Sequence, residues 1–563
     1  MKFYTAQFRN LILAATLAMV VEFLMSLTDR VVAGNLLGEP ALAGLGLCTA
    51  ADQLAVFFSL LVACGASIRF LSAMGRFDAA AARRAFSCGL FAAIGLGVLV
   101  SGLLTVARDP FLGLFGADPE TLGHAVSYWR WFMAAILVMP LQIYLLVMVY
   151  ADGDETACMI SYPVQLGVNA VVSWLGCRAY GTAGCAFGTF CGNLASVAVL
   201  SGHFLKRANA LRPVAWFSFR ELGLMAKGAF ADAAVQLCWA VMTIVVCRVT
   251  AAADPALMPV AATVGTMLGF TVVFDGVSTA AQPLLEVYYG EGNFRRVRSL
   301  MKLATTAVVI EGLVVSLVEV AAPQVVLELV GIEDGPSRAA AAEAVRTVGL
   351  AMVFWALAAL YNSYYQYIER PLLACALVAV KELVVPAVFV LAGFRLGGFR
   401  GIWIGYALAA PVSLVLFATG VRILRGRHAV PLLLPAGADE RMYVWDAVAD
   451  ASGASAVSRA IAEILRKEGG RCESARMAPL IVEETLMLVN ERNRDRRVRA
   501  EVLLDLRSRP TLIIRDDGEI FDLTDADQRV ESFRTYLVAE LMYSQKDRRN
   551  LTTTGFNRNR FVF

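Results

Sequence analysis

Long runs of apolar residues dominate the first three quarters of the chain. A helix needs about 20 apolar residues to cross the hydrocarbon core of a bilayer. Windows of that length predict twelve membrane-spanning helices, near residues 9–33, 45–73, 84–106, 125–150, 160–178, 184–205, 222–250, 257–288, 303–322, 341–366, 372–394 and 401–423. The first window contains Glu22 and is too long for a signal peptide, so we interpret it as a span.

The loops between these windows differ in charge. Lys and Arg are enriched in the cytoplasmic loops of membrane proteins. With the N-terminus inside, alternate loops collect the basic residues, among them Arg83, Arg212, Arg295 and Arg425, and only the acidic turn at 151–158 departs from this pattern. A high ratio of arginine to lysine is typical of a GC-rich bacterial genome. We therefore expect a multi-pass protein of the bacterial inner membrane with both termini in the cytoplasm.

The last part of the chain follows another pattern. After Pro435 about 34% of the residues are charged, against about 12% before it. The prolines and glycine of HAVPLLLPAGADE predict a linker at 429–440. Beyond it, SGASAVSRAIAEILRKEGG and MAPLIVEETLMLVNERN predict two helices, and RAEVLLDLR and TLIIRDD predict adjacent strands. Residues 441–563 are thus expected to form a small cytoplasmic α/β domain.

Composition excludes several classes of protein. A net charge of +3 without a basic stripe does not favour nucleic acid as a partner. Most of the 11 cysteines lie in or beside apolar runs without CxxC spacing, and the three histidines are scattered. We therefore expect no disulfide framework, no metal site and no enzyme activity in the membrane part.

Glycines repeat at a constant offset in the apolar part. Three pairs stand about 215 residues apart, the kind of internal symmetry found in many transporters: Gly75 with Gly290, Gly116 with Gly331, and Gly184 with Gly401. They predict an all-α polytopic fold with two six-helix lobes, residues 1–212 (spans 1–6) and 213–428 (spans 7–12). An even number of spans in each lobe gives a pseudo-two-fold axis along the membrane normal.

Several segments resemble MATE transporters, the multidrug and toxic-compound extrusion family. SLTDRVVAGNLLGEPALAGLGL looks like the first-span motif of that family, and VACGASIRFLSAMGRFDAAAARRAF like its second span and following turn. LGVNAVVSWLGCRAYGTAGCAFGT, QPLLEVYYGEGNFRRVRSLMK and GGFRGIWIGYALA are similar to later motifs in the same order. The resemblance covers residues 1 to about 425. It implies multidrug efflux by alternating access of two lobes, driven by H⁺ or Na⁺.

The same resemblance implies an ion-coupling site in the first lobe. Asp29 matches the acidic residue of the first-span motif, and a charge inside the bilayer costs about 2.5–3.5 kcal/mol, so its presence calls for a reason. Asn169 matches a polar residue of the fifth span. Ser173 stands where several branches of the family carry a second carboxylate, which leaves Na⁺ and H⁺ open. Thr189 is expected to complete this cluster.

The second lobe offers candidates for the substrate cavity. Gln282 and Pro283 stand in the QP motif of the family, and Glu286 follows at i+4 on the same helix face. Glu22 is a further acidic candidate. Lys381 and Glu382 are expected to neutralise each other. Acidic groups exceed basic ones in the apolar windows, which favours an organic cation as the cargo.

The tail resembles the GHKL ATPase fold, most closely anti-sigma-factor kinases. Glu484 fits the catalytic glutamate of that fold, but Leu488 occupies the position of the Mg²⁺-binding asparagine. Asp516 and Gly518 match its adenine motif, whereas the segment around Ser532–Thr535 has no glycine-rich phosphate lid. Without those groups we expect no turnover of ATP. The resemblance leaves nucleotide binding, regulation and dimerisation as roles for the tail.

Three functions follow from these patterns. The first is an antiporter that exports organic cations and xenobiotics in exchange for H⁺ or Na⁺, needs no cofactor and carries a regulatory ATPase-like domain. The second keeps the fold but moves a lipid-linked or anionic substrate, for which a basic cavity would be expected. The third is a nucleotide-sensing membrane signalling protein, which would need a phosphoacceptor histidine, and His428 is the one nearby.

Overall fold

The structure is a computed structural model of the 563-residue chain. It describes residues 2–75, 78–152, 154–206, 209, 211–332, 335–368, 370–425, 432–434, 440–468, 476–519, 547–551 and 557–563.

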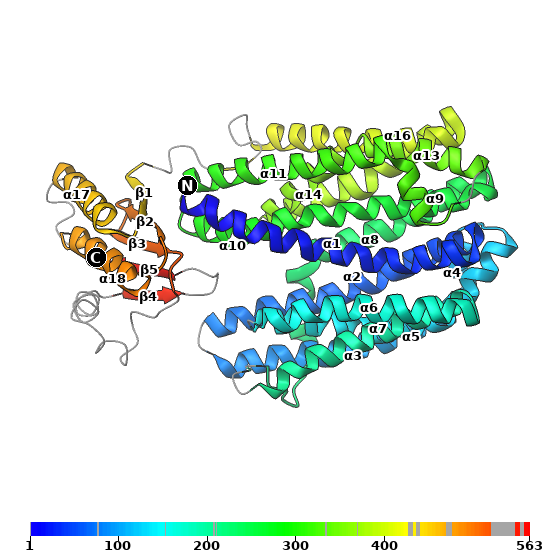
Figure 1. Ribbon diagram of the computed structural model, residues 1–563, viewed down its shortest axis with the longest axis horizontal. Helices are drawn as coiled ribbons and strands as arrows, with labels where there is room; N and C mark the ends of the chain where they lie inside the picture. The colour runs from blue at the N-terminus through cyan, green and yellow to red at the C-terminus, as the bar shows by residue number, and fades with distance from the viewer. Residues whose placement is uncertain are drawn as a thin grey trace. The chain divides into compact units, whose positions relative to one another are not determined.

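Helices make up the described chain before residue 426 except for its turns and the connecting segment 211–218 (Figure 1). Their bounds are α1 (Phe3–Leu37), α2 (Glu39–Gly75), α3 (Ala79–Val106), α4 (Arg108–Gly113), α5 (Pro119–Ala151), α6 (Glu155–Tyr180), α7 (Thr182–Ser201), α8 (Phe219–Ala253), α9 (Met258–Leu268), α10 (Asp275–Gly290), α11 (Phe294–Ala321), α12 (Pro323–Leu329), α13 (Pro336–Gly349), α14 (Met352–Tyr367), α15 (Pro371–Val378) and α16 (Val385–Arg425). Short turns of other helix types are η1 (Gly202–Leu205), η2 (Pro255–Leu257), η3 (Gly269–Phe274) and the π-helical η4 (Ala379–Val384). The predicted all-α character of this part of the chain is thereby confirmed for its described residues.

The described helices give ten or eleven candidate spans where twelve are predicted, and the last two predicted windows account for part of the difference. Among the described residues, ten helical segments are long and apolar enough to cross a membrane, or up to eleven if the bent pair Ser337–Gly349 and Met352–Tyr367 forms one span. The last two predicted windows fall within one helical segment, Leu372–Ile423, of 52 residues. At 1.5 Å per residue that length, about 78 Å, exceeds one crossing of the bilayer. Gly398 interrupts it with a φ of 59°, which glycine adopts without strain.

The loop glycines of the sequence repeat occupy equivalent places in both halves. Gly75 is the last residue of α2 and Gly290 is the last residue of α10. Gly116 and Gly331 both have a positive φ, 70° and 77°. Because a side chain is strained in that conformation, the repeat preserves glycine where each half needs the same turn.

Helix packing repeats as well. A Cβ atom added to Gly184 would lie 2.0 Å from the carbonyl oxygen of Gly176, and one added to Gly401 would lie 1.9 Å from that of Gly393. Only glycine at these positions lets two consecutive helical segments touch backbone to backbone. The two contacts lie about 217 residues apart along the chain, which is the offset of the glycine repeat.

The acidic turn that departs from the charge pattern has local basic partners. The imidazole of His203 lies between two carboxylates, with Nδ1 2.7 Å from Asp154 Oδ2 and Nε2 2.8 Å from Asp152 Oδ2. Lys206 Nζ donates to Asp154 Oδ2 at 2.6 Å. Lys206 and His203 together lower the pKa of Asp154 to about 2. The turn after α5 and the end of α7 therefore lie on the same side, as the predicted topology requires.

The tail is a five-stranded antiparallel sheet with two helices on one face (Figure 1). The strands are β1 (Met442–Val448), β2 (Arg499–Asp505), β3 (Thr511–Asp516), β4 (Asp547–Leu551) and β5 (Asn557–Val562), in the order β1-β2-β3-β5-β4. The helices are α17 (Ala451–Glu468) and α18 (Ala478–Arg492). Their apolar faces and alternate strand residues, such as Ile461, Leu486 and Ile514, form a buried core. The predicted helices and strands are confirmed, whereas the GHKL likeness stays a prediction.

The chain divides into two compact units. One contains Met1–Ala14, Thr279–Ala304 and His428–Phe563, and the other contains Ala15–Ser278 and Thr305–Arg427. The tail is thus grouped with the start of α1, the end of α10 and the start of α11. The predicted limits of lobes and linker stay predictions.

Candidate functional site

Asp29 lies at the centre of a buried polar cluster formed by four helices. Its side chain on α1 is 8% exposed. Tyr128 Oη on α5 donates to Asp29 Oδ2 at 2.9 Å, and Ser173 Oγ on α6 donates to Asp29 Oδ1 at 3.1 Å. Thr189 on α7 also donates to Asp29 Oδ2, and Asn169 Nδ2 donates to Thr189 Oγ1 at 3.1 Å. The structure therefore brings together all four residues predicted for ion coupling.

Small residues of α7 make this cluster fit. Asn169 and Ser173 are one turn apart on α6 and share a face. A Cβ atom on Gly188 would lie 2.0 Å from Ser173 Oγ, and one on Gly192 would lie 3.1 Å from Asn169 Cβ. The glycines therefore let α7 approach α6 closely enough for Thr189 to reach the carboxylate.

The chemistry of the cluster suits a small hard cation or a proton. The side chains that donate hydrogen bonds to Asp29 in the described part of the chain are the hydroxyls of Tyr128, Ser173 and Thr189, and the amide of Asn169 stands behind Thr189. Asn169 Oδ1 is buried without a hydrogen-bond partner in the described part of the chain. Oxygen atoms of this kind are the ligands that hard cations prefer. A carboxylate in the bilayer can also take up and release a proton, and the hydroxyls around it hydrogen-bond either form.

Arg30 follows Asp29 directly on α1. Among the described residues, its side chain forms no hydrogen bond with this cluster. Its Nη1 donates to Thr266 Oγ1 on α9 at 2.6 Å, and its Nη2 donates to Thr49 Oγ1 on α2 at 2.9 Å. One step along a helix turns a side chain by about 100°, so consecutive residues face different neighbours. Arg30 therefore acts on Asp29 only through space, as it does on Asp52, and leaves the carboxylate of Asp29 to its hydroxyl donors.

Tyr128 is the member of the cluster that the sequence analysis missed. It belongs to the apolar helix α5 and is buried beside Phe132, with 5.0 Å between the ring centroids. Tyrosine in an apolar run is usual in a helix core, and its distance from Asp29 along the chain gives no spacing signal. The hydroxyl of a buried tyrosine needs a partner, which is the one hint that the sequence offered.

The second predicted cavity group is only partly assembled. Gln282 Nε2 donates to Glu286 Oε1 at 3.0 Å along one face of α10, as their spacing predicts, and Glu286 is exposed. The backbone of Glu22 lies in α1, but its side chain lies outside the described residues. Lys381 and Glu382 form an ion pair, and Trp239 Nε1 donates to Glu382 Oε2 at 3.1 Å. The expected neutralisation of Lys381 by Glu382 is therefore found.

Two more carboxylates lie on α11. Thr16 Oγ1 donates to Glu311 Oε1 at 3.1 Å. Glu319 is fully buried, and neither of its carboxylate oxygens has a hydrogen-bond partner among the described residues. In the described part of the chain, buried carboxylates thus occur on α11 as well as at Asp29.

The predicted nucleotide residues of the tail meet at the end of β3. Asp516 is fully buried, and its Oδ1 accepts from Asn557 Nδ2 at 2.8 Å and from the Gly518 amide at 3.0 Å. Asp516 Oδ2 has no hydrogen-bond partner among the described residues. Asn493 Oδ1 accepts from the amide of Glu519 at 2.8 Å, which holds the turn after β3. Asn557 and Asn493 were not among the predicted residues.

The other tail predictions lie on α18 or beyond the described residues. Glu484 is half-buried on α18, and Leu488 one turn later is buried at the position predicted to lack a metal ligand. The segment around Ser532–Thr535 lies outside the described residues. Among the residues described, the tail therefore brings Asp516 and Gly518 together.

We expect an Asp516→Asn exchange to stabilise the tail at pH 7.5 but not at pH 4. Burial raises the pKa of Asp516 to about 6. The folded domain thus holds this proton more tightly than the unfolded chain, so the wild-type domain loses stability as the pH rises from about 4 to about 6. The difference should be on the order of 1–3 kcal/mol.

Hydrogen exchange of β3 and β5 in the full chain, corrected for intrinsic rates at each pH, measures this difference. Asp495→Asn, at an exposed position of the same domain, is the control. The same difference between Asp516→Asn and wild type at both pH values would contradict the prediction.

Comparison with known proteins identifies the class. Residues 14–175 match the family model MatE. No curated protein gives a significant match. The chain is similar to an inward-facing multidrug resistance MATE family transporter of the MOP superfamily, with 19% identity over 71% of this chain and 95% of that one and a TM-score of 0.64. It is similar to an outward-facing transporter of the same description, with 20% identity, 74% and 96% coverage and a TM-score of 0.61.

A third similar structure is a MOP superfamily transporter from Pyrococcus furiosus, described by a reverse polarity of its binding pocket that suggests a different function. It shows 21% identity over 74% of this chain and 95% of that one, with a TM-score of 0.61. At these identities the likeness establishes the fold. The chain therefore has the fold of MATE transporters, and its residues 14–175 match the MatE family model. At the level of the fold, the expected likeness to MATE transporters is confirmed.

Proposed function

We propose that this chain is a secondary antiporter of the bacterial inner membrane that exports organic cations in exchange for H⁺ or Na⁺. The Asp29 cluster carries this proposal. A buried carboxylate surrounded by hydroxyl and amide groups can hold a proton or a Na⁺ ion. Similar folds occur in inward-facing and outward-facing transporters, which supports alternating access for this chain.

The charges of the spans favour a cationic cargo. Glu286 is exposed and bonded to an uncharged amide, while Glu319 has no hydrogen-bond partner among the described residues. Carboxylates without cations attract a cationic substrate and disfavour an anionic one. The transporter from Pyrococcus furiosus, with its reverse pocket polarity, keeps a lipid-linked or anionic cargo as the second candidate.

For the tail we propose a regulatory role rather than catalysis. Asp516 and Gly518 stand where the likeness to GHKL ATPases predicts recognition of a base, but Leu488 stands where ATP turnover would need a metal ligand. Nucleotide binding and dimerisation are the two means of regulation that we propose. His428, on which the signalling alternative depends, lies outside the described residues.

Transport into proteoliposomes tests the function. A fluorescent organic cation is offered to the full chain under an imposed pH step and, separately, under an imposed Na⁺ step. We expect movement of the cation to follow one of the two gradients and to be missing in liposomes without protein. An anionic dye and a labelled lipid are offered in parallel. Movement of either of these, with no movement of any cation, would favour the second candidate.

A further inference from the structure

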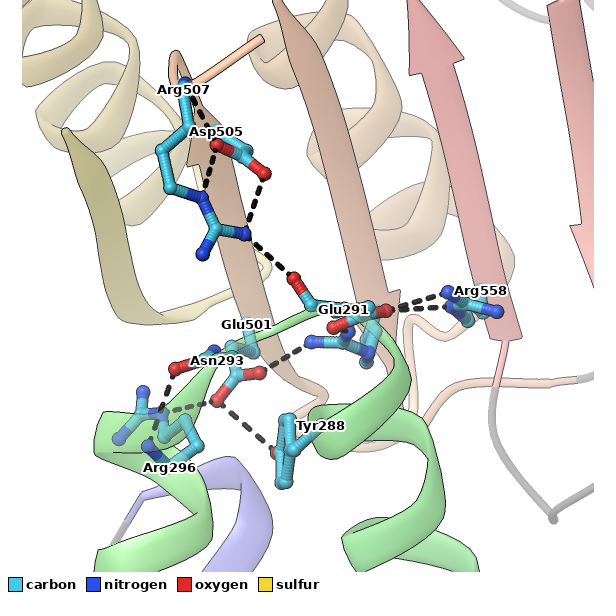
Figure 2. A network of polar contacts seen from close by, with 9 residues as sticks. Tyr288, Glu291, Asn293, Arg296, Glu501, Asp505, Arg507 and Arg558 are labelled. Carbon is cyan, nitrogen blue, oxygen red and sulfur yellow. Dashed lines mark hydrogen bonds and ion pairs between the residues drawn. The ribbon is translucent and has the colours of Figure 1, made fainter. Parts of the chain in front are cut away.

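One face of the tail sheet carries two arginines directly opposite each other. Arg515 on β3 pairs with Arg558 on β5 in the strand register. Like charges opposite each other destabilise a sheet. The carboxylate of Glu291, from the turn 291–293 between α10 and α11, binds both arginines. Arg558 donates from Nε at 3.0 Å and from Nη2 at 2.6 Å to Oε1 (Figure 2). Arg515 donates to Oε2.

A second carboxylate on the same face is fully buried. Glu501 on β2 accepts from Arg515 Nη1 at 2.6 Å, forms an ion pair with Arg296 Nε of α11 at 2.7 Å, and accepts from Tyr288 Oη of α10 at 3.3 Å (Figure 2). Burial alone would lower the pKa of Arg515. The nearby carboxylates of Glu291 and Glu501 have the larger, opposite effect, so the pKa of Arg515 is raised. Removing one partner would leave a buried charge uncompensated, which destabilises the folded state. The charges on this face of the sheet therefore match those of the turn that covers it.

Arg507 adds a contact to the backbone of the same turn. Its Nη2 donates to the carbonyl oxygen of Glu291 at 2.8 Å, and its Nη1 donates to that of Gly292 at 3.2 Å. Asp505 holds the guanidinium with an Nη2–Oδ2 distance of 2.8 Å (Figure 2). A cation near the C-terminus of α10 is favoured by the helix dipole. The tail thus binds both the side chain and the backbone of the turn.

The start of α1 joins the same network. Asp446 on β1 accepts from the Phe3 amide at 3.3 Å and from Arg296 Nη2 at 2.7 Å. The guanidinium of Arg296 also lies 5.0 Å from the ring centroid of Tyr4. Because α1 is one helix from Phe3 to Leu37, the residues tied here belong to the helix that carries Asp29.

We propose that this charged face (Asp446, Glu501, Arg507, Arg515 and Arg558) is a clamp that ties the start of α1 to the α10–α11 turn and keeps transport slow while it is closed. The inference rests on the proposed antiport. α1 and α11 belong to different halves of the sequence repeat, and alternating access moves such halves relative to each other. A tether between them stabilises one arrangement, so opening the clamp increases turnover.

Two conservative variants test the clamp in the full chain. Glu291→Gln removes the carboxylate shared by the two arginines, and Arg558→Gln removes a partly exposed arginine while Arg515 keeps Glu501. Arg560→Gln is the matched control, because it changes the same charge on the same strand without an ion pair in the described part of the chain. A double variant, Glu291→Arg with Arg558→Glu, reverses the pair.

Amide hydrogen exchange of residues 286–296 measures whether the tail stays bound to the α10–α11 turn. Cation transport by the same proteoliposomes measures the turnover rate. We expect Glu291→Gln and Arg558→Gln to increase both, with transport rising at least about fivefold. Arg560→Gln should change neither, and the reversed pair should return both toward wild type.

Unchanged exchange in Glu291→Gln and Arg558→Gln would overturn the docking. If exchange increases in these variants but their transport is unchanged or slower, while wild type transports the cation, the tail binds the turn but does not slow transport. That outcome would overturn the clamp and leave the antiport standing. Increased exchange in a chain that moves no cation in any variant would overturn the proposed antiport while the docking stands.

Discussion

Replacing Asp29 by asparagine is expected to lower gradient-driven cation transport about 100-fold, to the background of liposomes without protein. Asparagine keeps the size of the side chain and one acceptor oxygen, and the hydroxyls of Tyr128, Ser173 and Thr189 can reorient toward its amide. It cannot take up a proton or contribute a negative charge to a Na⁺ site. The variant should therefore fold like wild type but lose coupling to the gradient.

The measurement compares initial transport rates and thermal unfolding midpoints of Asp29→Asn and wild type. Asp109→Asn is the control, because Asp109 is an exposed aspartate paired with the adjacent Arg108 at 2.7 Å. Full gradient-driven transport by Asp29→Asn would contradict the assignment of Asp29 to ion coupling. A lowered unfolding midpoint would instead show that the carboxylate stabilises the helix packing.

The sequence was sufficient to predict the helices and part of the Asp29 cluster. Apolar windows located the spans because a bilayer fixes their length. Asn169 and Ser173 could be placed together because their spacing puts them on one helix face. The last two windows, 372–394 and 401–423, lie on either side of Gly398, where a positive φ turns the backbone between two helical segments. Tyr128 could not be foreseen because helix packing alone brings it to Asp29.

The contacts of the tail lay further beyond sequence reasoning. Glu291, Arg515 and Arg558 each read as an ordinary charge near the surface, in a turn or on a strand. Their meeting depends on strand register, which sets Arg515 opposite Arg558, and on the docking of a turn more than 200 residues away. Long-range ion pairs leave no periodic signal, so pattern reasoning recovered the elements of the tail and missed its binding face.

A Gly188→Ala exchange is expected to lower transport at least about tenfold without touching any group that binds an ion, because overpacking of this kind costs about 1–3 kcal/mol. The added Cβ atom would lie 2.0 Å from Ser173 Oγ and 2.5 Å from the Ser173 amide nitrogen, whereas ordinary contacts are 3.4–4 Å. The backbone clash cannot be relieved by rotating a side chain, so α6 and α7 must move apart. Thr189 and Ser173 would then no longer reach Asp29 together.

Transport per monodisperse reconstituted protein and the thermal unfolding midpoint should both fall for Gly188→Ala. Gly102→Ala on α3 is the matched control, because its added Cβ atom would meet nothing within 4 Å. If Gly188→Ala transported as well as Gly102→Ala, close contact between α6 and α7 would not be what positions the donors around Asp29. If only Gly188→Ala loses transport, ion coupling by Asp29 depends on the close packing of α7 against α6. The small residues of α7 would then be what holds the hydroxyls of Ser173 and Thr189 against the carboxylate.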